Sequence, residues 1–205
     1  MRRFILTGAP GAGKTSIIRL LEMSGVGVVE EAATDVIAAG QALGQAEPWT
    51  DPEFIDQVVS LQRERQLQAA AAPVDVQVHD RSPICTLALS RYVGWPTSPV
   101  LEAEVDRITR EQLFDHRVFF VRNLGFCEPT AARRISFEES LVFERIHEHT
   151  YRRFGYDLVD VAAGPVQDRV SLIRNVILRS TRQAVSLTRT ADDRPRPGRS
   201  RPEVI

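Results

Sequence analysis

The sequence predicts an α/β protein in which a parallel sheet of five strands lies between layers of helices. Short, mostly apolar segments alternate with longer segments of helical spacing along most of the chain. A glycine-rich segment joins the first apolar run to the first helical segment. Because parallel strands need a crossover between them, usually a helix, this alternation is typical of a sheet with helices on both faces.

The expected strands are apolar runs of four to seven residues, at residues 3–7, 27–30, 74–80, 117–121 and 156–161. The third run differs from the others, because Val74, Val76 and Val78 alternate with polar residues. A strand in the middle of a parallel sheet is usually apolar throughout. This alternation therefore counts against a central position for the third strand.

The expected helices carry apolar residues at helical spacing, and several have recognisable ends. Asp51 and Pro52 suit the N-cap and first turn of a helix, and Gly155 suits the position after a helix C-terminus. The helices are expected at residues 16–21, 34–43, 51–72, 82–93, 99–113, 137–154 and 166–184.

The composition divides the chain into a folded domain at residues 1–185 and a tail at residues 186–205. The chain has 205 residues, of which 43% are hydrophobic, which is enough for the core of one domain. From about Ser186 the sequence is rich in Ser, Thr, Arg and Pro and has few apolar residues. We expect this tail to be disordered, because such a segment cannot bury a core.

Charge and cysteine content exclude several classes of function. A net charge of −1 argues against a dedicated nucleic-acid-binding protein, which usually carries a basic excess. No signal peptide is evident, and no run of about 18 apolar residues suggests a membrane helix. Cys85 and Cys127 lack metal-ligand spacing, so we expect a reducing, cytoplasmic location. The sequence leaves the oligomeric state open, a homodimer included.

Residues 8–15 read Gly-Ala-Pro-Gly-Ala-Gly-Lys-Thr, which matches the phosphate-binding loop of nucleoside triphosphatases and kinases. Lys14 is the only lysine of the sequence, among 26 Lys and Arg residues. The match follows a predicted strand and precedes a predicted helix, so loop amides and a helix N-terminus would surround phosphate oxygens. Lys14 would reach the phosphates, and the Thr15 hydroxyl would ligate Mg²⁺. The residues expected to bind ATP are Gly8, Ala9, Pro10, Gly11, Ala12, Gly13, Lys14, Thr15 and Ser16.

Two acidic positions follow other predicted strands. Asp80 ends the third strand, where ligands of open parallel sheets bind, and it could hold Mg²⁺ or accept a proton from a hydroxyl. Arg81 next to it suits a substrate phosphate or a developing charge. A structural ion pair between Asp80 and Arg81 is the alternative. Glu30 and Glu31 end the second strand, where they are candidates for binding substrate hydroxyls or Mg²⁺, or for favourable charges at a helix N-terminus.

Other candidates lie further along the chain. Arg133 and Arg134 precede a long helix and could close over a transferring phosphate, or form a solvated pair, and Arg145 is a weaker candidate on that helix. Residues 147–149 read His-Glu-His but lack the i, i+4 spacing of a zinc helix, so we interpret them as a solvated helix face. Trp49 and Trp95 could line an aromatic pocket, but packing is the simpler interpretation.

These motifs together resemble those of the small P-loop kinases and predicted ATPases related to the ribosylnicotinamide kinase domain of NadR, often labelled "AAA family ATPase". The resemblance spans roughly residues 1–178. It rests on residues 7–15, on Val29-Glu30-Glu31-Ala32-Ala33, on Asp80-Arg81-Ser82, on Arg153-Phe154-Gly155-Tyr156 and on residues 166–170.

The resemblance implies a P-loop NTPase fold, a three-layer sandwich around a five-stranded parallel sheet, with Mg-ATP and an arginine-bearing lid. It implies that Lys14 and Thr15 bind phosphate and Mg²⁺, and that Asp80 is the base or the metal-binding acid. Arg133 or Arg134 would be the lid cation. Residues 127–132 lack the expected acid-rich lid pattern, which leaves the choice of lid arginine open. Pro165 and Val166 would lie against adenine.

The sequence thus favours a Mg-ATP-dependent phosphotransferase that acts on a small-molecule hydroxyl, nucleoside- or riboside-like. The alternative is an ATP- or GTP-binding regulatory switch with slow hydrolysis and a protein partner. A remodelling ATPase fits least well, because no second acid follows Asp80 and no helical C-terminal domain is evident.

Overall fold

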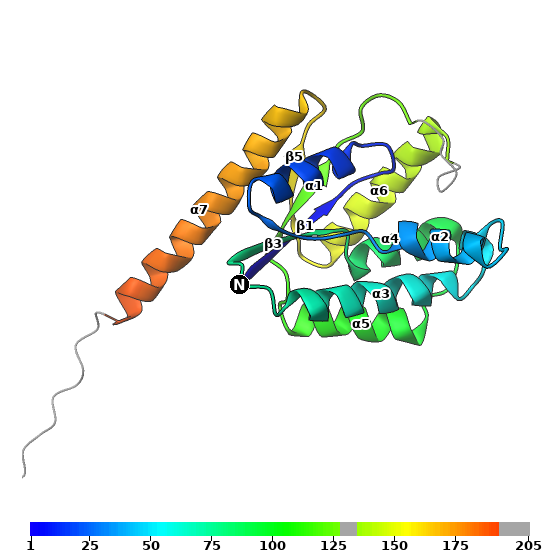
Figure 1. Ribbon diagram of the computed structural model, residues 1–205, viewed down its shortest axis with the longest axis horizontal. Helices are drawn as coiled ribbons and strands as arrows, with labels where there is room; N and C mark the ends of the chain where they lie inside the picture. Colours follow the sequence, from blue (N-terminus) through cyan, green and yellow to red (C-terminus); the bar gives the residue numbers. More distant parts are fainter. Residues whose placement is uncertain (128–134, 193–205) are drawn as a thin grey trace, which may run out of the picture.

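The computed structural model describes residues 1–127 and 135–192 of the chain, with side chains up to Thr181. Its centre is a sheet of five parallel strands in the order β2-β3-β1-β4-β5 (Figure 1). The strands are β1 (Arg2–Thr7), β2 (Gly27–Val29), β3 (Val76–Asp80), β4 (Arg117–Val121) and β5 (Asp157–Val161). The α/β class, the number of strands and their parallel arrangement predicted from the sequence are confirmed.

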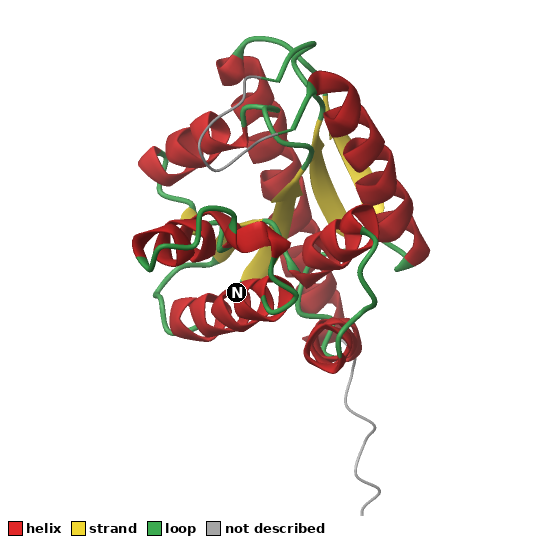
Figure 2. Cartoon of the chain, turned by 90° about the vertical axis from the view of Figure 1, so that its right-hand side faces the viewer, coloured by secondary structure: helices red, strands yellow, loops and turns green. Residues whose placement is uncertain are grey.

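Helices cover both faces of this sheet (Figure 2). They are α1 (Lys14–Met23), α2 (Ala33–Ala42), α3 (Phe54–Ala69), α4 (Pro83–Val93), α5 (Pro99–Arg110), α6 (Phe137–Arg153) and α7 (Val166–Asp192), with a 3₁₀ turn at Pro48–Thr50. Sequence and structure therefore agree on the order of the helices, and the differences lie at their ends.

Alternate residues of the buried strands point to two separate cores. Phe4 and Leu6 of β1 pack with residues of α1 and α7 on one face of the sheet. Ile5 between them packs on the other face with residues of α2, α3, α4 and α5, and with Tyr151 of α6. Since all three β1 side chains are fully buried, β1 is held rigidly from both sides, and the loop after Thr7 starts from a fixed point.

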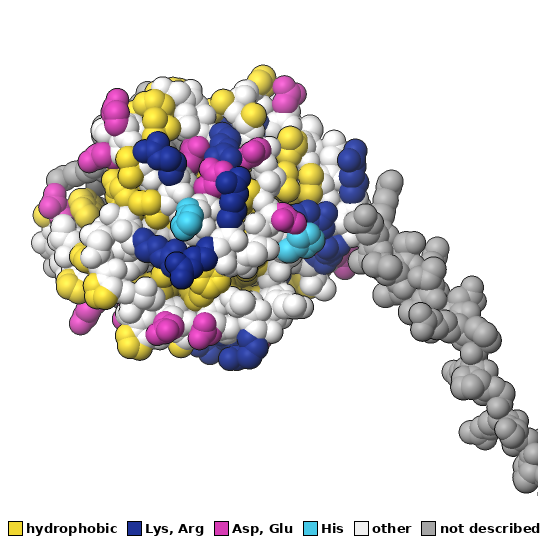
Figure 3. Space-filling view, turned by 180° about the vertical axis from the view of Figure 1, so that it is seen from behind, with side chains coloured by type: hydrophobic (Ala, Val, Ile, Leu, Met, Phe, Trp, Pro, Cys, Tyr) yellow, Lys and Arg dark blue, Asp and Glu magenta, His cyan; other side chains and the backbone are white. Residues whose placement is uncertain are grey.

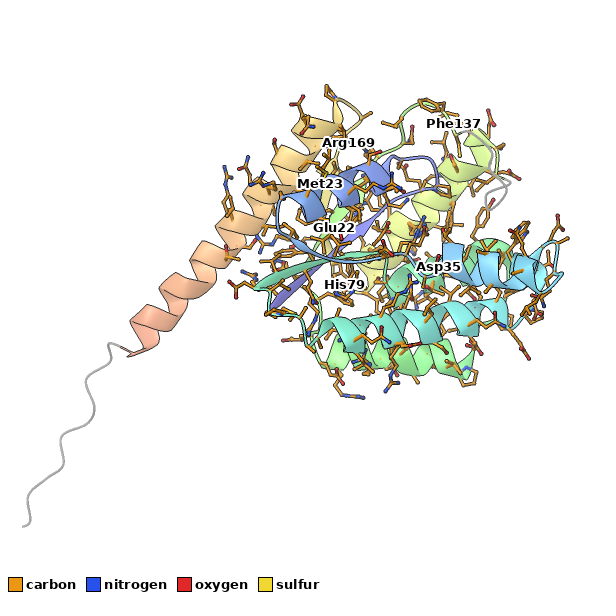
Figure 4. All side chains as sticks on the ribbon, viewed as in Figure 1. Glu22, Met23, Asp35, His79, Phe137 and Arg169 are labelled. Atoms are coloured by element: carbon orange, nitrogen blue, oxygen red, sulfur yellow. The ribbon has the colours of Figure 1, made fainter. Side chains whose placement is uncertain are left out.

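The polar residues of β3 do not place it at the sheet edge, because β3 pairs with both β2 and β1. Gln77 and His79 are almost fully buried, and the Gln77 side-chain amide donates a hydrogen bond to the Ala69 carbonyl. His79 packs edge-on against Phe114 at 5.0 Å between ring centroids, on the face covered by α3 (Figure 4). Burial and the nearby charge of Arg3 lower the pKa of His79 to about 3, so this histidine is neutral.

Two helix ends differ from the sequence-based expectation. Helix α3 begins at Phe54 rather than near residue 51, because the chain first forms the 3₁₀ turn and the Asp51 carboxylate accepts a hydrogen bond from the Glu53 amide. Helix α7 continues to Asp192, past the end expected near residue 184, and its C-terminal part extends beyond the sheet (Figure 1). The division into a domain and a tail stays a prediction, because residues 193–205 lie outside the described part.

Arginine and acidic side chains alternate on the molecular face seen in Figure 3 rather than forming one field of a single sign. Oppositely charged side chains also pair closely, as at Arg122, where Glu144, Glu148 and Asp160 surround the guanidinium. Among the described residues, no helix has the length and apolar content needed to cross a membrane.

Gly8, the first residue after β1, has no room for a side chain. Its φ is +139°, a conformation that residues with a Cβ rarely adopt, and an added Cβ would lie 2.2 Å from the Val121 carbonyl oxygen. We expect Gly8→Ala to lower the free energy of unfolding by more than about 3 kcal/mol. Gly25→Ala is the matched control, because Gly25 also has a positive φ (+84°) but nothing within 4 Å. Denaturant unfolding of the two variants should give clearly different losses, and equal losses would contradict the close packing at Gly8.

Candidate functional site

The glycine-rich loop after β1 leads directly into α1, as the sequence predicts. Gly8, Gly11 and Gly13 all have positive φ values, and Gly13 is the N-cap of α1 in the left-handed region. An added Cβ on Gly11 would lie 3.1 Å from the Cys127 sulfur. The loop thus curls tightly in front of a helix N-terminus, which is the geometry that binds phosphate groups. Thr15 and Ser16 in the first turn of α1 are exposed.

The Lys14 side chain folds back over this loop. Its Nζ donates hydrogen bonds to the carbonyl oxygens of Gly8 at 3.1 Å and of Ala9 at 2.9 Å. Burial, and next the charge of Arg81, lower the pKa of Lys14 to about 8, although Asp80 and Glu31 act in the opposite direction. The lone lysine therefore lies in the loop that its motif predicts, with its charge only partly compensated.

Asp80 and Arg81 lie at the carboxyl end of β3, beside Lys14. The Asp80 Oδ1 atom is buried and has no hydrogen-bond partner among the described residues. Burial raises the pKa of Asp80 to about 6, and Glu31 contributes in the same direction while Lys14 and Arg81 oppose it. Arg81 has φ +75°, and its backbone amide donates to the Leu6 carbonyl at 2.9 Å, which ties this turn to β1.

Glu31 and Arg81 form an ion pair between Oε1 and Nε, and the Thr34 hydroxyl donates to Glu31 at 3.1 Å. Burial acts to raise the pKa of Glu31, but the charges of Arg81 and Lys14 outweigh it, so the pKa is lowered. Glu30 does not share this environment. It is exposed and lies outside the main cavity, against a small neighbouring hollow.

These groups form one end of a cavity of about 550 Å³. Lys14, Thr15, Glu31, Asp80 and Arg81 are the polar groups at the phosphate-loop end. The other walls come mainly from apolar and aromatic side chains of the 3₁₀ turn, α2, α3, α4, α6 and the segment after β4, namely Ile37, Trp49, Phe54, Val58, Leu89, Tyr92, Val93, Phe126, Ile135 and Phe143. Clefts of this size and mixed lining are typical of small-molecule sites. Both tryptophans pack against the core, as expected, and Trp49 also lines the cavity.

The interpretation of residues 147–149 as a solvated helix face is wrong for His147. His147 is fully buried, and its Nε2 lies 2.8 Å from the sulfur of Cys85, which lines the cavity. Glu148 instead pairs with Arg122 and Arg152, while His149 is exposed. The spacing of α6 contains the signal for this burial, because Phe143, His147 and Tyr151 recur at i, i+4 and i+8 on the buried face. Among the described residues, no group of three or more His, Cys, Asp or Glu side chains is arranged so that it could hold a metal ion.

Arg169 of α7 is a further residue at the phosphate loop that the sequence alone did not single out. Its guanidinium donates to the Ala12 carbonyl at 2.8 Å and to the Arg122 carbonyl at 3.3 Å, while Nε is buried without a partner among the described residues. Figure 4 shows Arg169 in the first turns of α7, next to the α1 layer. Pro165 precedes the same helix and Val166 begins it, but neither lines the main cavity. Pro165 is exposed, and Val166 packs beside α1.

The predicted lid arginines, Arg133 and Arg134, lie outside the described residues. Arg145 is described and exposed on α6. The structure therefore brings together Lys14, Thr15, Glu31, Asp80 and Arg81 in one cavity, and it does not bring Glu30, Arg145, Pro165 or Val166 into it.

Comparisons with known proteins agree with this geometry. Deoxyadenosine kinase from M. mycoides, with the products dCMP and a flexible dCDP bound, is similar over 86% of this chain and 99% of its own, at 15% identity and a TM-score of 0.54. The structure of the same kinase with dCTP bound is similar over 87% of this chain and 100% of its own, at 15% identity and a TM-score of 0.56.

A third similar structure is the NadR protein in complex with NAD and AMP-PNP. The similarity covers 85% of this chain and 49% of NadR, about half its length, at 14% identity and a TM-score of 0.62. At these identities the structures share the fold, and no curated protein sequence matches the chain. The strand order, the phosphate loop and the neighbours identify a P-loop NTPase fold, which implies nucleotide binding. Residues 3–169 match the model of an AAA domain family, so the chain belongs to that family.

Proposed function

We propose that this protein is a Mg-ATP-dependent kinase that transfers a phosphoryl group to a hydroxyl of a small nucleoside- or riboside-like molecule. The single observation that carries the proposal is the cavity that joins the phosphate loop to a mostly apolar, aromatic compartment. A protein that only hydrolyses nucleotide needs no second compartment of this kind next to the phosphates. By their descriptions, the proteins of similar fold are a deoxyadenosine kinase with dCMP and dCDP bound and the NadR protein with NAD and AMP-PNP bound.

The charged end of the cavity suits phosphoryl transfer. Lys14, the loop amides and the α1 N-terminus would hold the β- and γ-phosphates of ATP. Arg81 would stabilise the charge that develops on the transferring group, and Glu31 would orient Arg81 or bind an acceptor hydroxyl. The pKa of Asp80, raised to about 6, lies near neutral pH, where a general base works most effectively. Asp80 would therefore accept the proton of the attacking hydroxyl.

The residues present also fit a magnesium ion. The buried Asp80 Oδ1 atom is an oxygen acceptor without a partner among the described residues, and Thr15 contributes a hydroxyl at the same end of the cavity. Oxygen donors of this type are those that Mg²⁺ prefers. Thr15 would hold the ion, and Asp80 would join it directly or through water where it acts as the metal-binding acid rather than as the base. The ion neutralises phosphate charge when bound.

The apolar end would hold the acceptor. Trp49, Tyr92, Phe126 and Phe143 supply aromatic surface to the cavity lining, which suits a flat heterocycle. Gln62 and Thr86 add polar groups there and are joined by a hydrogen bond of 3.0 Å. A nucleoside-like acceptor would then direct its sugar hydroxyl toward Asp80 and its base into the aromatic compartment. Arg133 and Arg134 remain candidates for a lid, and Pro165 and Val166 for contacts to adenine.

Lys14→Ala should abolish the thermal stabilisation that Mg-ATP or AMP-PNP gives the wild-type protein. A ligand at 100 times its Kd adds about 2.7 kcal/mol to stability, and this gain disappears when the phosphate contact is lost. Arg19→Ala is the matched control, because it removes an exposed cation from the same helix. Differential scanning fluorimetry measures the effect, and equal stabilisation of Lys14→Ala and wild type would contradict nucleotide binding at this loop.

A screen of ATP consumption against nucleosides, ribosides and other small alcohols should identify acceptors that raise ADP production above the rate in buffer alone. The expected result is a clear dependence on one chemical group of acceptors, since the aromatic compartment is specific in shape. A low rate that no acceptor changes would contradict the kinase proposal and support the alternative, an ATP- or GTP-binding switch with slow hydrolysis.

Asp80→Asn should reduce acceptor-dependent turnover by about 10²-fold or more, the usual scale of general base catalysis, with a much smaller change in ATP affinity. The substitution keeps the shape of the side chain and removes its charge. Asp75→Asn is the matched control. It makes the same change at an exposed position just before β3, at the end of the strand opposite to Asp80. Steady-state kinetics and nucleotide titration separate the two effects. Arg81→Ala should also reduce turnover, and wild-type turnover in both the Asp80 and Arg81 variants would make this pair structural.

A further inference from the structure

Cys85 lies in the first turn of α4, where its sulfur meets three polar groups from three different elements. The Sγ atom is 2.8 Å from His147 Nε2 on α6, 3.2 Å from Arg81 Nη1 after β3 and 3.3 Å from Thr7 Oγ1 on β1. Because the guanidinium can only donate, the sulfur is the acceptor in its contact with Arg81. A cysteine that served only as a small apolar core residue would not collect these neighbours.

The tautomer of His147 follows from its second contact. Its Nδ1 atom lies 3.1 Å from the Phe143 carbonyl oxygen, one turn earlier in α6. Since a carbonyl only accepts hydrogen bonds, Nδ1 carries the proton of the neutral ring, and the lone pair of Nε2 faces the Cys85 sulfur. His147 is therefore oriented to take the thiol proton. In the resulting pair both N–H groups of the ring have partners, one the carbonyl and the other the thiolate. A cysteine activated by an oriented histidine in this way is a nucleophile.

Charge around the sulfur also favours the thiolate. Burial alone would raise the pKa of Cys85, but His147 and Arg81 outweigh it and lower the pKa to about 6. The titratable and charged groups that interact electrostatically with this cluster are Lys14 on α1, Glu31 after β2, Asp80 and Arg81 at the end of β3, and His147 and Tyr151 on α6.

Cys85 also lines the cavity, although it is only 2% exposed. Small molecules that enter the cavity can therefore reach the sulfur. Cys127 differs from Cys85 both in its exposure and in its position, because it is not among the residues that line the cavity. It is partly exposed beside the phosphate loop, where its sulfur lies 3.7 Å from the Pro10 carbonyl.

We propose that Cys85, activated by His147, is a modification site that small hydroperoxides oxidise to a sulfenic acid. The thiolate sulfur attacks one oxygen of hydrogen peroxide, an S–O bond forms and the O–O bond breaks. The leaving hydroxide takes the Nε2 proton of the His147 imidazolium and departs as water, so the sulfur is oxidised and the peroxide reduced. The oxidised sulfur loses its negative charge and with it the charged contact to Arg81. The expected loss of acceptor turnover rests on the proposed kinase function, whereas the oxidation itself does not.

The first test measures alkylation by iodoacetamide as a function of pH, followed by intact-protein mass spectrometry, in the Cys127→Ser protein. We expect a rate midpoint near pH 6, against about 8.5 for an ordinary thiol. At pH 6.5, His147→Gln in the same background should slow alkylation at least about tenfold. His149→Gln, an exposed histidine two residues away, should leave the profile unchanged. A midpoint at 8 or above in the Cys127→Ser protein overturns the proposal, even if the His147 variant does not fold.

The second test exposes the same proteins to hydrogen peroxide and traps sulfenic acid with dimedone. One dimedone adduct should form in the Cys127→Ser protein and none when Cys85 is also replaced by Ser. The absence of an adduct in the first protein, or equal rates with and without His147, overturns the proposal. Both tests measure the mass of the modified protein and do not depend on enzymatic turnover. Their failure is therefore distinguishable from failure of the kinase proposal. A fall in acceptor turnover in step with adduct formation supports the link through Arg81.

Discussion

The Arg81 guanidinium connects several polar groups at the phosphate-loop end of the cavity. It meets the Glu31 carboxylate, the Gly8 carbonyl at 3.4 Å and the Cys85 sulfur, while its backbone amide bonds to β1. These contacts join the ends of β1, β2 and β3 to the start of α4. A left-handed conformation in a residue other than glycine costs about 1 to 2 kcal/mol. From this conformation, in the tight turn after β3, the Arg81 side chain reaches all three partners. Such strain is found most often at functional sites.

The same cluster places two cations and two carboxyl groups close together, with Lys14 and Asp80 buried. Lys14 and Arg81 repel each other, which together with burial lowers the pKa of Lys14, while burial raises that of Asp80. The loop carbonyls of Gly8 and Ala9 accept hydrogen bonds from the ammonium group. The two cations beside the loop amides and the α1 N-terminus would attract the negative charge of a triphosphate, so the arrangement is complementary to a phosphate ligand. Sites of this type trade stability for function.

The sequence allowed the sheet, its parallel strands and the phosphate loop to be predicted, because each depends on local patterns such as apolar runs, glycines and helix ends. The central position of β3 was harder to see, since its buried Gln77 and His79 resemble exposed residues in a one-dimensional pattern. The Cys85–His147 pair could not be predicted from spacing, as its members are 62 residues apart on different helices. Only the i, i+4, i+8 pattern of α6 indicated that His147 faces inward. The roles of Glu31, Asp80, Arg133 and Arg134 remain predictions, because they depend on ligands and on a segment outside the described residues.

The thiol cluster and the proposed phosphoryl-transfer site share one cation. A phosphate oxygen close to Arg81 and a thiolate at Cys85 would both be stabilised by the positive charge of the same guanidinium. Glu31 already pairs with its Nε atom. The Cys85 charge therefore reduces the positive potential that Arg81 offers to a phosphate, and a bound phosphate reduces the stabilisation of the thiolate. The two sites are thus coupled by electrostatics without any movement of the backbone. Linked equilibria are reciprocal. The factor by which ionisation of the thiol weakens phosphate binding therefore equals the factor by which bound phosphate lowers the acid dissociation constant of the thiol.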